Sequence, residues 1–276
     1  MHSSEITITS KFLVTGGYGF LAKKLVDKLT GRGDDVIVVC RDRQKASETY
    51  EGNERVKVVT GDLIQYSTNE ELLKENINGI YHLSAYRDVM SCEKNPIEAV
   101  KSNIISTLNV LDLSVRCGAK FVVGASTFAA DKPTGAYGAT KLLTEKLFAQ
   151  FQEINQQANY GVLRFGPLLY CPNSVLDNWK KALDKKEKIV LTSPSATRKF
   201  VSVDSVVEEM LKNPKGIEEF NTKSIRLADL LKAFVEKYSD DPDSVEKEVT
   251  GLREGEQLES GNSDELMSIE DIKQII

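Results

Sequence analysis

A short apolar run that leads straight into a glycine cluster is the feature that most constrains how this chain can fold. Phe12-Leu13-Val14 is followed by Thr15-Gly16-Gly17-Tyr18-Gly19, and a helical pattern begins directly after it. Glycines at this spacing permit a tight turn and let the backbone approach a pyrophosphate at a helix N-terminus, where free N–H groups and the helix dipole favour negative charge. A plain turn is the alternative, but this context predicts a dinucleotide-binding loop made of Gly16, Tyr18, Gly19, Phe20 and Leu21.

Apolar runs alternate with helical patterns through the first half of the chain. Residues 36–40 are all apolar and four of them are β-branched, which suits a strand buried on both faces. Further runs lie at 56–59, 80–83 and 121–123, with helical stretches at 21–29, 69–76, 96–115 and 139–152. This order predicts an α/β fold, namely a Rossmann-type doubly wound parallel sheet with helices on both faces.

The pattern loosens after residue 164, where Pro167, Pro172 and Pro194 interrupt short elements. We therefore expect a dinucleotide-binding domain over residues 1–166 and a small C-terminal substrate-binding lobe over residues 167–276. Parts of 196–215 are expected to return to the first domain.

Charge and composition argue against several classes of protein. The chain has 276 residues with 36 basic and 41 acidic side chains, so it lacks the broad basic surface of a nucleic-acid-binding protein. The acidity is concentrated in residues 236–276, which hold 13 acidic and 4 basic side chains, and the rest is mildly basic. No apolar run approaches the ~18 residues of a membrane span, and the N-terminus does not resemble a signal peptide. With widely spaced cysteines and two histidines, we expect a cytoplasmic protein without a metal site or a membrane partner.

Charged residues after the second and third apolar runs bear on the cofactor. NAD-binding loops of this kind place an acidic residue about 20 positions further on, where it holds the ribose 2′-hydroxyl group. Arg41 and Arg43 instead suit a 2′-phosphate through bidentate hydrogen bonds, which favours NADP, while Asp42 keeps NAD as the alternative. Asp62 follows the third run, where its carboxylate is placed to accept a hydrogen bond from the adenine amino group.

Tyr137 and Lys141 are four residues apart and therefore share one face of a predicted helix. A neighbouring cation lowers the pKa of a phenol and makes it a usable general base. Ser126-Thr127 end a predicted strand at the sheet edge where ligands bind, so Thr127 can contact the same substrate oxygen as Tyr137. A surface pair is the alternative, but together with the glycine loop these residues predict hydride transfer at a carbinol.

These residues resemble the extended short-chain dehydrogenase/reductase superfamily. The matching positions are the glycine loop, Gly61-Asp62, 82–85, Asn103 and the Tyr137/Lys141 pair. Within the superfamily the chain is most similar to inverting UDP-N-acetylglucosamine 4,6-dehydratases of polysaccharide biosynthesis, over residues 95–103, 126–141, 197–200 and 251–258. The last stretch, Gly-Leu-Arg-Glu-Gly-Glu-Gln-Leu, resembles that group's late signature Gly-Leu-Arg-Pro-Gly-Glu-Lys-Leu.

The resemblance implies an NADP-dependent lyase with an internal redox cycle. Hydride leaves C4 of the UDP-sugar while Tyr137 takes the hydroxyl proton, water is lost across C5 and C6, hydride returns to C6, and C5 is reprotonated with inversion. The resemblance adds Leu63, Leu83, Ser84, Ala85, Tyr137 and Lys141 to the cofactor contacts. For the UDP-sugar it implies Tyr86, Ser174, Val175, Arg198 and Arg253.

The sequence departs from that group directly after Thr127. The group's Asp-Lys pair, which supplies the acid and the amine for elimination, is replaced by Phe128-Ala129. Asp131 and Lys132 would take these catalytic roles after a local loop shift, and a solvated turn before Pro133 is the other interpretation. The alternatives are therefore a UDP-sugar 4-reductase or 4-epimerase, which needs no elimination pair, and a non-catalytic NADP-binding regulator.

Two long predicted helices of the Rossmann domain carry apolar faces. In the superfamily such helices pair between subunits, so the resemblance implies a homo-oligomer. The apolar positions are Val100, Ile104, Ile105, Leu108 and Leu111 on one helix, and Leu142, Leu143, Leu147 and Phe151 on the other.

Overall fold

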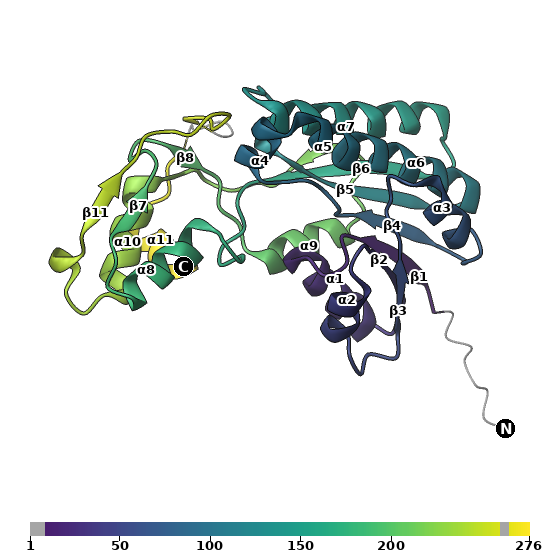
Figure 1. The fold of residues 1–276 in the computed structure, drawn as a ribbon, viewed down its shortest axis with the longest axis horizontal. Coiled ribbons are helices and arrows are strands. Elements are labelled where there is room, and N and C mark those ends of the chain that lie inside the picture. Colours follow the sequence, from purple (N-terminus) through teal and green to yellow (C-terminus); the bar gives the residue numbers. More distant parts are fainter. Residues whose placement is uncertain (1–8, 260–264) are drawn as a thin grey trace.

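A seven-stranded parallel sheet forms the main body of the computed structural model, which describes residues 9–259 and 265–276 (Figure 1). The strand order is β3-β2-β1-β4-β5-β6-β9, so the order reverses between β1 and β4 and opens a crevice at their carboxyl ends. The predicted doubly wound sheet is confirmed. Its strands are β1 (Lys11–Thr15), β2 (Asp35–Cys40), β3 (Val56–Thr60), β4 (Gly79–His82), β5 (Phe121–Thr127), β6 (Asn159–Phe165) and β9 (Gly216–Glu219).

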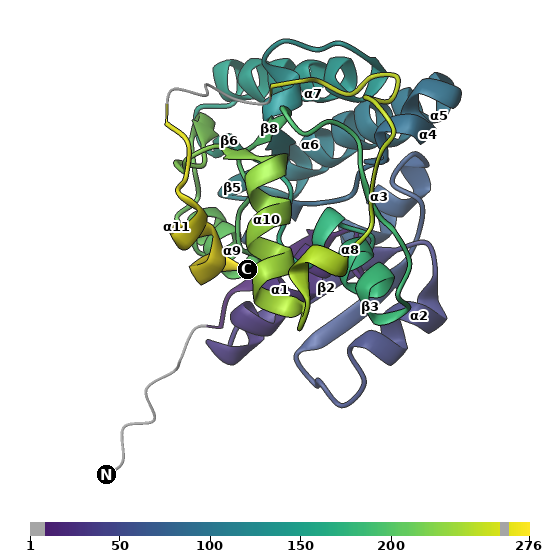
Figure 2. The ribbon, with the colours of Figure 1, turned by 90° about the vertical axis from the view of Figure 1, so that its left-hand side faces the viewer.

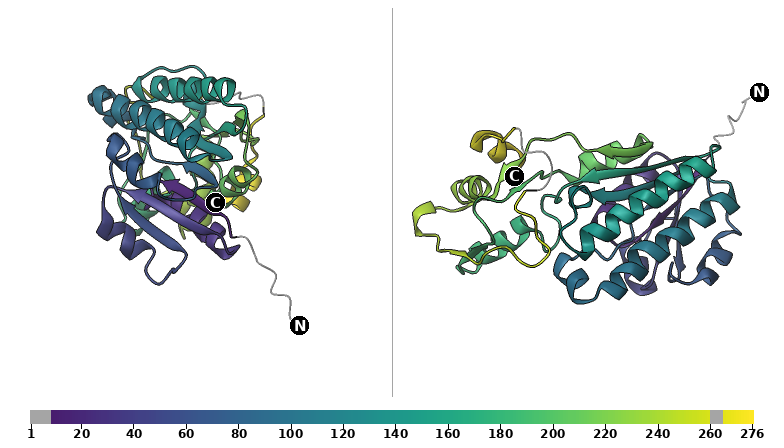
Figure 3. Two further views of the ribbon diagram at one scale, coloured as in Figure 1. Left: turned by 90° about the vertical axis from the view of Figure 1, so that its right-hand side faces the viewer. Right: turned by 90° about the horizontal axis from the view of Figure 1, so that it is seen from above.

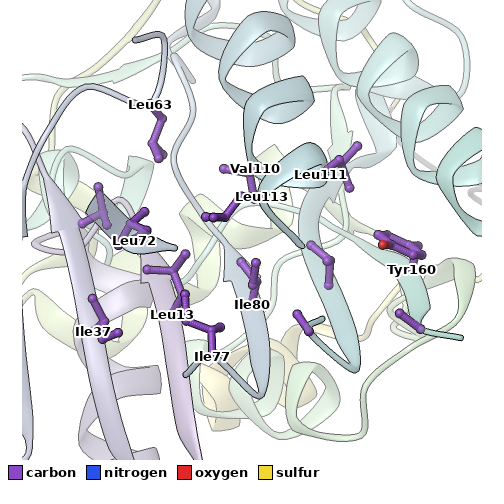
Figure 4. Packing of buried hydrophobic residues seen from close by; sticks show 14 of the residues in the cluster. Leu13, Ile37, Leu63, Leu72, Ile77, Ile80, Val110, Leu111, Leu113 and Tyr160 are labelled. Atoms are coloured by element: carbon purple, nitrogen blue, oxygen red, sulfur yellow. The ribbon is translucent and has the colours of Figure 1, made fainter. Parts of the chain in front are cut away.

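Helices cover both faces of this sheet because successive strand residues point to opposite sides and both sides are apolar. Leu13 packs into the core on one face and Val14 into the core on the other. Figure 4 shows Leu13, Ile37, Ile80 and Tyr160 in the first of these cores. That face is covered by α3 (Tyr66–Leu72), α6 (Ser106–Cys117) and α7 (Ala136–Ile154), with α4 (Val89–Lys94) and α5 (Pro96–Val100) beside them. The other face is covered by α1 (Phe20–Gly31) and α9 (Val203–Leu211). Helix α2 (Arg43–Thr49) packs beside β2 and β3.

The second lobe has its own hydrophobic core and faces the viewer in Figure 2. Trp179 and Phe234 meet edge to face there, with ring centroids 5.6 Å apart. The lobe contains two small sheets of two strands each: β8 pairs with β10 in antiparallel orientation, and β7 pairs with β11 in parallel orientation. Its elements are α8 (Val175–Asp184), β7 (Ile189–Leu191), β8 (Thr197–Arg198), β10 (Ile225–Arg226), α10 (Leu227–Tyr238), β11 (Lys247–Val249) and α11 (Ile269–Ile275).

One segment leaves the second lobe and returns to the main sheet. Helix α9 packs on α1, and β9 then pairs with β6 in parallel. Because β9 lies beyond residue 215, the returning segment extends further than the sequence predicted. The strand was missed because its residues after Gly216 are largely exposed and include Glu218 and Glu219, so no apolar run marks it.

Two kinds of feature are absent from residues 9–259 and 265–276. None of their helices combines the length and the apolar character needed to cross a lipid bilayer. The same residues contain no cluster of three His, Cys, Asp or Glu side chains arranged to hold a metal ion.

Candidate active site

A cavity of about 770 Å³ lies between the carboxyl ends of the main strands and the second lobe. It brings together the glycine loop, the end of β5, the start of α7 and several lobe residues, which are far apart in the sequence. The predicted site residues that line it are Gly16, Gly19, Phe20, Leu21, Leu83, Ala85, Thr127, Tyr137, Lys141, Ser174, Val175, Arg198 and Arg253. The cavity wall does not include Tyr18, Arg41, Arg43, Asp62, Leu63, Ser84, Tyr86, Asp131 or Lys132.

Two glycines of the loop have no room for a side chain. Gly16 has a φ of +72°, and a Cβ there would lie 3.0–3.1 Å from backbone atoms of Leu83 and Ser84. A Cβ on Gly17 would lie only 1.8 Å from Cγ1 of Val38. The loop therefore lies directly against β2 and the end of β4.

Helix α1 presents its N-terminus to the cavity without a side-chain cap. Gly19 occupies the cap position, and no side chain accepts a hydrogen bond from the first helical N–H groups. Phe20, Leu21 and Ala22 follow it in the cavity wall. Free N–H groups and the helix dipole favour an anion at this point. The loop therefore fits the diphosphate of a dinucleotide.

At the end of β2, Asp42 forms a polar side-chain contact within the described part of the protein, whereas the neighbouring Arg41 and Arg43 do not. The Asp42 carboxylate accepts a hydrogen bond from the N–H of Lys45 at 3.0 Å and so caps α2. The Lys45 ammonium group lies 4.9 Å from the ring centroid of Tyr18. Arg41 and Arg43 are exposed, and neither forms an ion pair among the described residues. This arrangement leaves both guanidinium groups available to a ligand.

The third strand end is less open than the sequence predicted. Oδ1 of Asp62 accepts the N–H of Ile64 at 3.0 Å, which fixes the carboxylate at the start of a turn. The Leu63 side chain is buried in the core, so only its backbone could contact a cofactor.

Tyr86 is held through its backbone, because Asn103 accepts its N–H at 2.7 Å and donates to its carbonyl oxygen at 3.0 Å. Asn103 lies in a π-helical turn, Lys101–Ile105, a distortion often found at functional sites.

Helix α7 carries the predicted proton-transfer pair in its first two turns. The Glu93 carboxylate accepts the N–H of Ala136 at 2.6 Å and caps the helix, a contact that sequence reasoning missed. The ammonium group of Lys141 donates to the carbonyl oxygen of Ala125 at 2.5 Å, which ties the helix to β5.

The environment changes the pKa values of both side chains. Burial raises the pKa of Tyr137 to about 12, whereas a hydrogen bond with Thr127 and the charge of Arg87 act in the opposite direction. Burial lowers the pKa of Lys141 to about 8, and the carboxylate of Glu145 opposes that effect. Arg87 lines the cavity but was not selected from the sequence. The raised pKa of Tyr137 differs from the expectation that a neighbouring cation lowers it, because burial outweighs the nearby charge in this structure. Groups with perturbed pKa values nevertheless cluster at functional sites.

Asp131 and Lys132 are exposed and do not line the cavity, so their predicted roles in elimination would still require a local loop shift. The chain forms a tight 3₁₀ turn over Phe128–Ala130 that Thr127 caps, and both residues are exposed after it. Asp131 contacts Arg164 at 3.4 Å with its side chain 55% exposed. Phe128 is buried instead, beneath the ammonium group of Lys199 at 4.9 Å from its ring centroid.

The second lobe contributes a strap, residues 251–258, that runs back to the main domain. Arg198 donates to the carbonyl oxygens of Gln257 and Leu258 at 2.7 and 3.2 Å, and burial lowers its pKa. Thr134 donates to the carbonyl oxygen of Gly255 at 3.3 Å, just before α7. The strap carries Arg253, whose guanidinium lies 3.3 Å from Glu256. Arg198 and Arg253 thus line the same cavity.

Ser174 has a structural contact as well as its place in the wall. Its hydroxyl group accepts the N–H of Asp177 at 3.3 Å and caps α8. Val175 begins that helix and packs against the lobe core.

Comparisons with known proteins agree with this geometry. A family described as polysaccharide biosynthesis protein matches residues 12–275. An uncharacterized membrane protein of Methanocaldococcus jannaschii is 32% identical over 260 residues, covering 89% of this chain and 78% of that protein. A UDP-N-acetylglucosamine 4,6-dehydratase (inverting) of Campylobacter jejuni is 29% identical over 263 residues, covering 89% of this chain and 75% of that enzyme. The crystal structure of Pen from Bacillus thuringiensis has a TM-score of 0.83 at 27% identity, covering 91% of this chain and 80% of that one.

Proposed function

The chain belongs to the polysaccharide biosynthesis protein family, and from that membership we propose that it is an enzyme that oxidises C4 of a UDP-sugar with a nicotinamide dinucleotide. The resemblance to extended short-chain dehydrogenase/reductases is confirmed. One observation carries the proposal: Thr127, Tyr137 and Lys141 lie in the wall of the same cavity as the glycine loop. A hydroxyl group bound there would be next to a phenol, an ammonium group and a diphosphate-binding helix.

The residues of the chain support proton removal from a carbinol. Tyr137 would accept the proton of the C4 hydroxyl group, and Thr127 would hydrogen-bond to the same oxygen. Lys141, one turn further along α7, would add a positive charge to that of Arg87 near the phenolate, and a nearby positive charge lowers the pKa of a phenol. A bound NADP⁺ would supply the hydride acceptor. Arg198 and Arg253 would bind the UDP diphosphate, where guanidinium groups form bidentate hydrogen bonds.

For the fate of the 4-keto sugar, we propose dehydration of UDP-N-acetylglucosamine with inversion at C5. Similarity to the inverting dehydratase of Campylobacter jejuni over most of the chain supports this choice. A 4-epimerase or 4-reductase is the second candidate, and a specific observation favours it. Phe128 and Ala129 stand directly after Thr127, so this position offers no acid or amine for elimination, whereas return of hydride to C4 needs neither.

NADP is the cofactor that we propose. Arg41 and Arg43 are exposed at the end of β2, while the Asp42 carboxylate is engaged in capping α2. A carboxylate that already caps a helix is less available to a ribose 2′-hydroxyl group. Two guanidinium groups suit a 2′-phosphate.

We also propose a homo-oligomer that pairs through α6 and α7, which lie side by side on one face of the sheet (Figure 3, blue and teal). Leu108 on α6 and Leu143 on α7 are exposed, as are Val100 on α5 and Ile105 in the π-helical turn before α6, whereas Ile104 and Leu111 are buried. Light scattering would test this, because Leu143→Glu should convert the oligomer to monomers and leave the fold intact.

Incubation with NADP⁺ and UDP-N-acetylglucosamine in deuterated water tests the proposed function. A 4-keto-6-deoxy product carrying solvent deuterium, seen by mass spectrometry, supports dehydration. A C4 epimer without water loss supports the second candidate. If neither forms while NADP⁺ binds, a non-catalytic NADP-binding regulator becomes the better account, and Tyr137→Phe should then leave the biological activity unchanged.

A further inference from the structure

A buried ion pair lies directly behind the proton-transfer site. Glu145 on α7 is fully buried, and Arg164 on β6 is 8% exposed. Nε and Nη2 of Arg164 donate to the two carboxylate oxygens of Glu145 at 2.8 and 2.7 Å. This is the bidentate geometry in which an arginine binds a carboxylate most strongly.

The Glu145 carboxylate also contacts the strand end that carries Thr127. The hydroxyl group of Ser126 donates to Oε1 of Glu145 at 2.6 Å. Glu145 follows Lys141 by four residues, so both side chains lie on the same face of α7. One carboxylate therefore touches the residue before Thr127 and belongs to a residue one helical turn beyond Lys141.

Burying this pair is costly, because each ion loses its hydration. A hydrophobic pair of similar volume would fill the space without that cost. The remaining donor of Arg164, Nη1, reaches Glu219 at 2.9 Å and Asp131 at 3.4 Å, and both carboxylates are about half exposed at the rim. The guanidinium group is thus held from the outer side by exposed carboxylates, while Glu145 holds it from the side of the active site.

We propose that Glu145 is a positioning residue for proton transfer: held by Arg164, its carboxylate fixes Ser126 at the end of β5 and balances the ammonium charge of Lys141. The inference rests on the proposed function, since it assigns Glu145 to the same proton-transfer site. It adds a residue that acts through Lys141 and Ser126 without contacting substrate.

The charged groups around Lys141 determine in which direction its pKa should move when Glu145 is replaced. Tyr137 and Glu145 share its helix, His82 on β4 and Arg164 on β6 come from the sheet, and its hydrogen bond goes to a backbone carbonyl of β5. Glu145 supplies the carboxylate of this group, and His82 is neutral because burial lowers its pKa to about 3. Removing its charge favours the neutral amine, and the uncompensated charge of Arg164 acts in the same direction.

The pKa of Lys141 in the ligand-free protein is the measurement that tests the proposal. It can be followed by NMR of protein labelled at lysine Cε, with Lys141→Arg identifying the resonance. We expect Glu145→Gln to lower that pKa by about one pH unit. The matched control is Glu219→Gln, which removes a carboxylate from the same guanidinium group at the exposed rim and should leave the pKa of Lys141 unchanged.

Glu145→Gln leaves Arg164 buried without a full partner, so this variant is at risk of not folding. The double variant Glu145→Gln/Arg164→Gln removes both charges and keeps a polar side chain at each position, and it should still lower the pKa of Lys141. An unchanged pKa in whichever variant folds would overturn the proposal. So would an equal shift in Glu219→Gln.

Measuring turnover of the UDP-sugar, in addition to the NMR titration, distinguishes a failure of this inference from a failure of the proposed function. If the wild-type protein converts the UDP-sugar, the alkaline limb of its pH–rate profile should move to lower pH in Glu145→Gln by the shift measured by NMR. An inactive wild-type protein would contradict the proposed function, while the NMR titration would still decide whether Glu145 controls Lys141. If Glu145→Gln is active and the alkaline limb of its pH–rate profile does not move, the Glu145–Arg164 ion pair has only a structural role.

Discussion

The hydroxyl group of Thr15 lies 2.9 Å from Nδ1 of His82 and donates its only proton to that ring nitrogen. The direction follows because the same oxygen accepts the N–H groups of Leu83 and Ser84, each at 3.0 Å. The His82 ring therefore carries its proton on Nε2, which donates to the hydroxyl group of Thr107 at 3.0 Å. A neutral imidazole thus joins β1, β4 and α6 beneath the predicted cofactor-binding loop.

This arrangement makes the stability of the fold depend on pH. Burial and the charge of Lys141 lower the pKa of His82 to about 3, whereas an unfolded histidine titrates near ~6.5. Above that pH neither state binds the proton, and below it only the unfolded state does. The free energy of unfolding should therefore fall as the pH decreases, by up to ~1.4 kcal/mol per pH unit. Urea unfolding of the wild-type protein and His82→Gln between pH 4.5 and 8 would measure it, and an identical pH dependence would contradict the assignment.

Tyr137→Phe should reduce kcat by about 10²- to 10⁴-fold, the range expected when a general base is removed. The phenyl ring fills the same space, so cofactor affinity measured by calorimetry should stay within about twofold of wild type. Tyr66→Phe is the control, because that tyrosine is half exposed and lies outside the cavity wall. Retention of most turnover by Tyr137→Phe would remove the phenol from the mechanism.

Gly17→Ala should weaken dinucleotide binding because the new Cβ would occupy the position of Val38 Cγ1. Truncation of the obstructing side chain in Gly17→Ala/Val38→Ala should restore part of the affinity lost. Gly16→Ala meets backbone atoms at a positive φ, so truncating Val38 should not rescue it. Dissociation constants from a double-mutant cycle would report a coupling for the first pair and none for the second.

Arg41→Ser/Arg43→Ser should raise the Kd for NADP⁺ about tenfold or more while leaving that for NAD⁺ nearly unchanged. Hydrogen bonds to charged groups contribute ~1.5–3 kcal/mol, and only NADP⁺ has the 2′-phosphate. Arg55→Ser, which removes an exposed arginine that pairs with Asp35, is the matched control. Equal losses for both cofactors would indicate that the arginines bind elsewhere on the dinucleotide.

Asp131→Asn and Lys132→Ala should each retain turnover within about twofold of wild type, because neither side chain lines the cavity. The exposed contact of Asp131 with Arg164 is worth at most ~1 kcal/mol, so stability should also change little. Steady-state kinetics and thermal unfolding of both variants would check this. A large loss of kcat with an unchanged Tm would return these residues to the elimination step.

Local patterns were enough to predict the fold class and part of the cavity wall. A strand, a glycine turn and a helix in sequence determine where α1 begins, and a four-residue spacing fixes the relation of Tyr137 to Lys141. The glycine loop, Thr127 and Arg253 all lie in the wall of one cavity.

Contacts between distant segments could not be predicted in this way. Glu145 and Arg164 are ordinary charged residues in the sequence, and only the packing of α7 on β6 buries them together. The spacing of Glu145 from Lys141 was the one signal that could have identified it. The positions of Asp131 and Lys132 depended on a single 3₁₀ turn, whose short-range hydrogen bonds leave no clear periodicity in the sequence.

The position of β9 has a consequence for biosynthesis. The main sheet is not complete until residue 219 has been made, because β9 pairs with β6 only after part of the second lobe has been synthesised. A nascent chain that ends near residue 166 would leave the edge of β6 unpaired and lack α9 over α1, a condition that favours aggregation. The two lobes therefore cannot be separated by one cut, and a soluble fragment of the Rossmann domain should have to extend to about Phe220.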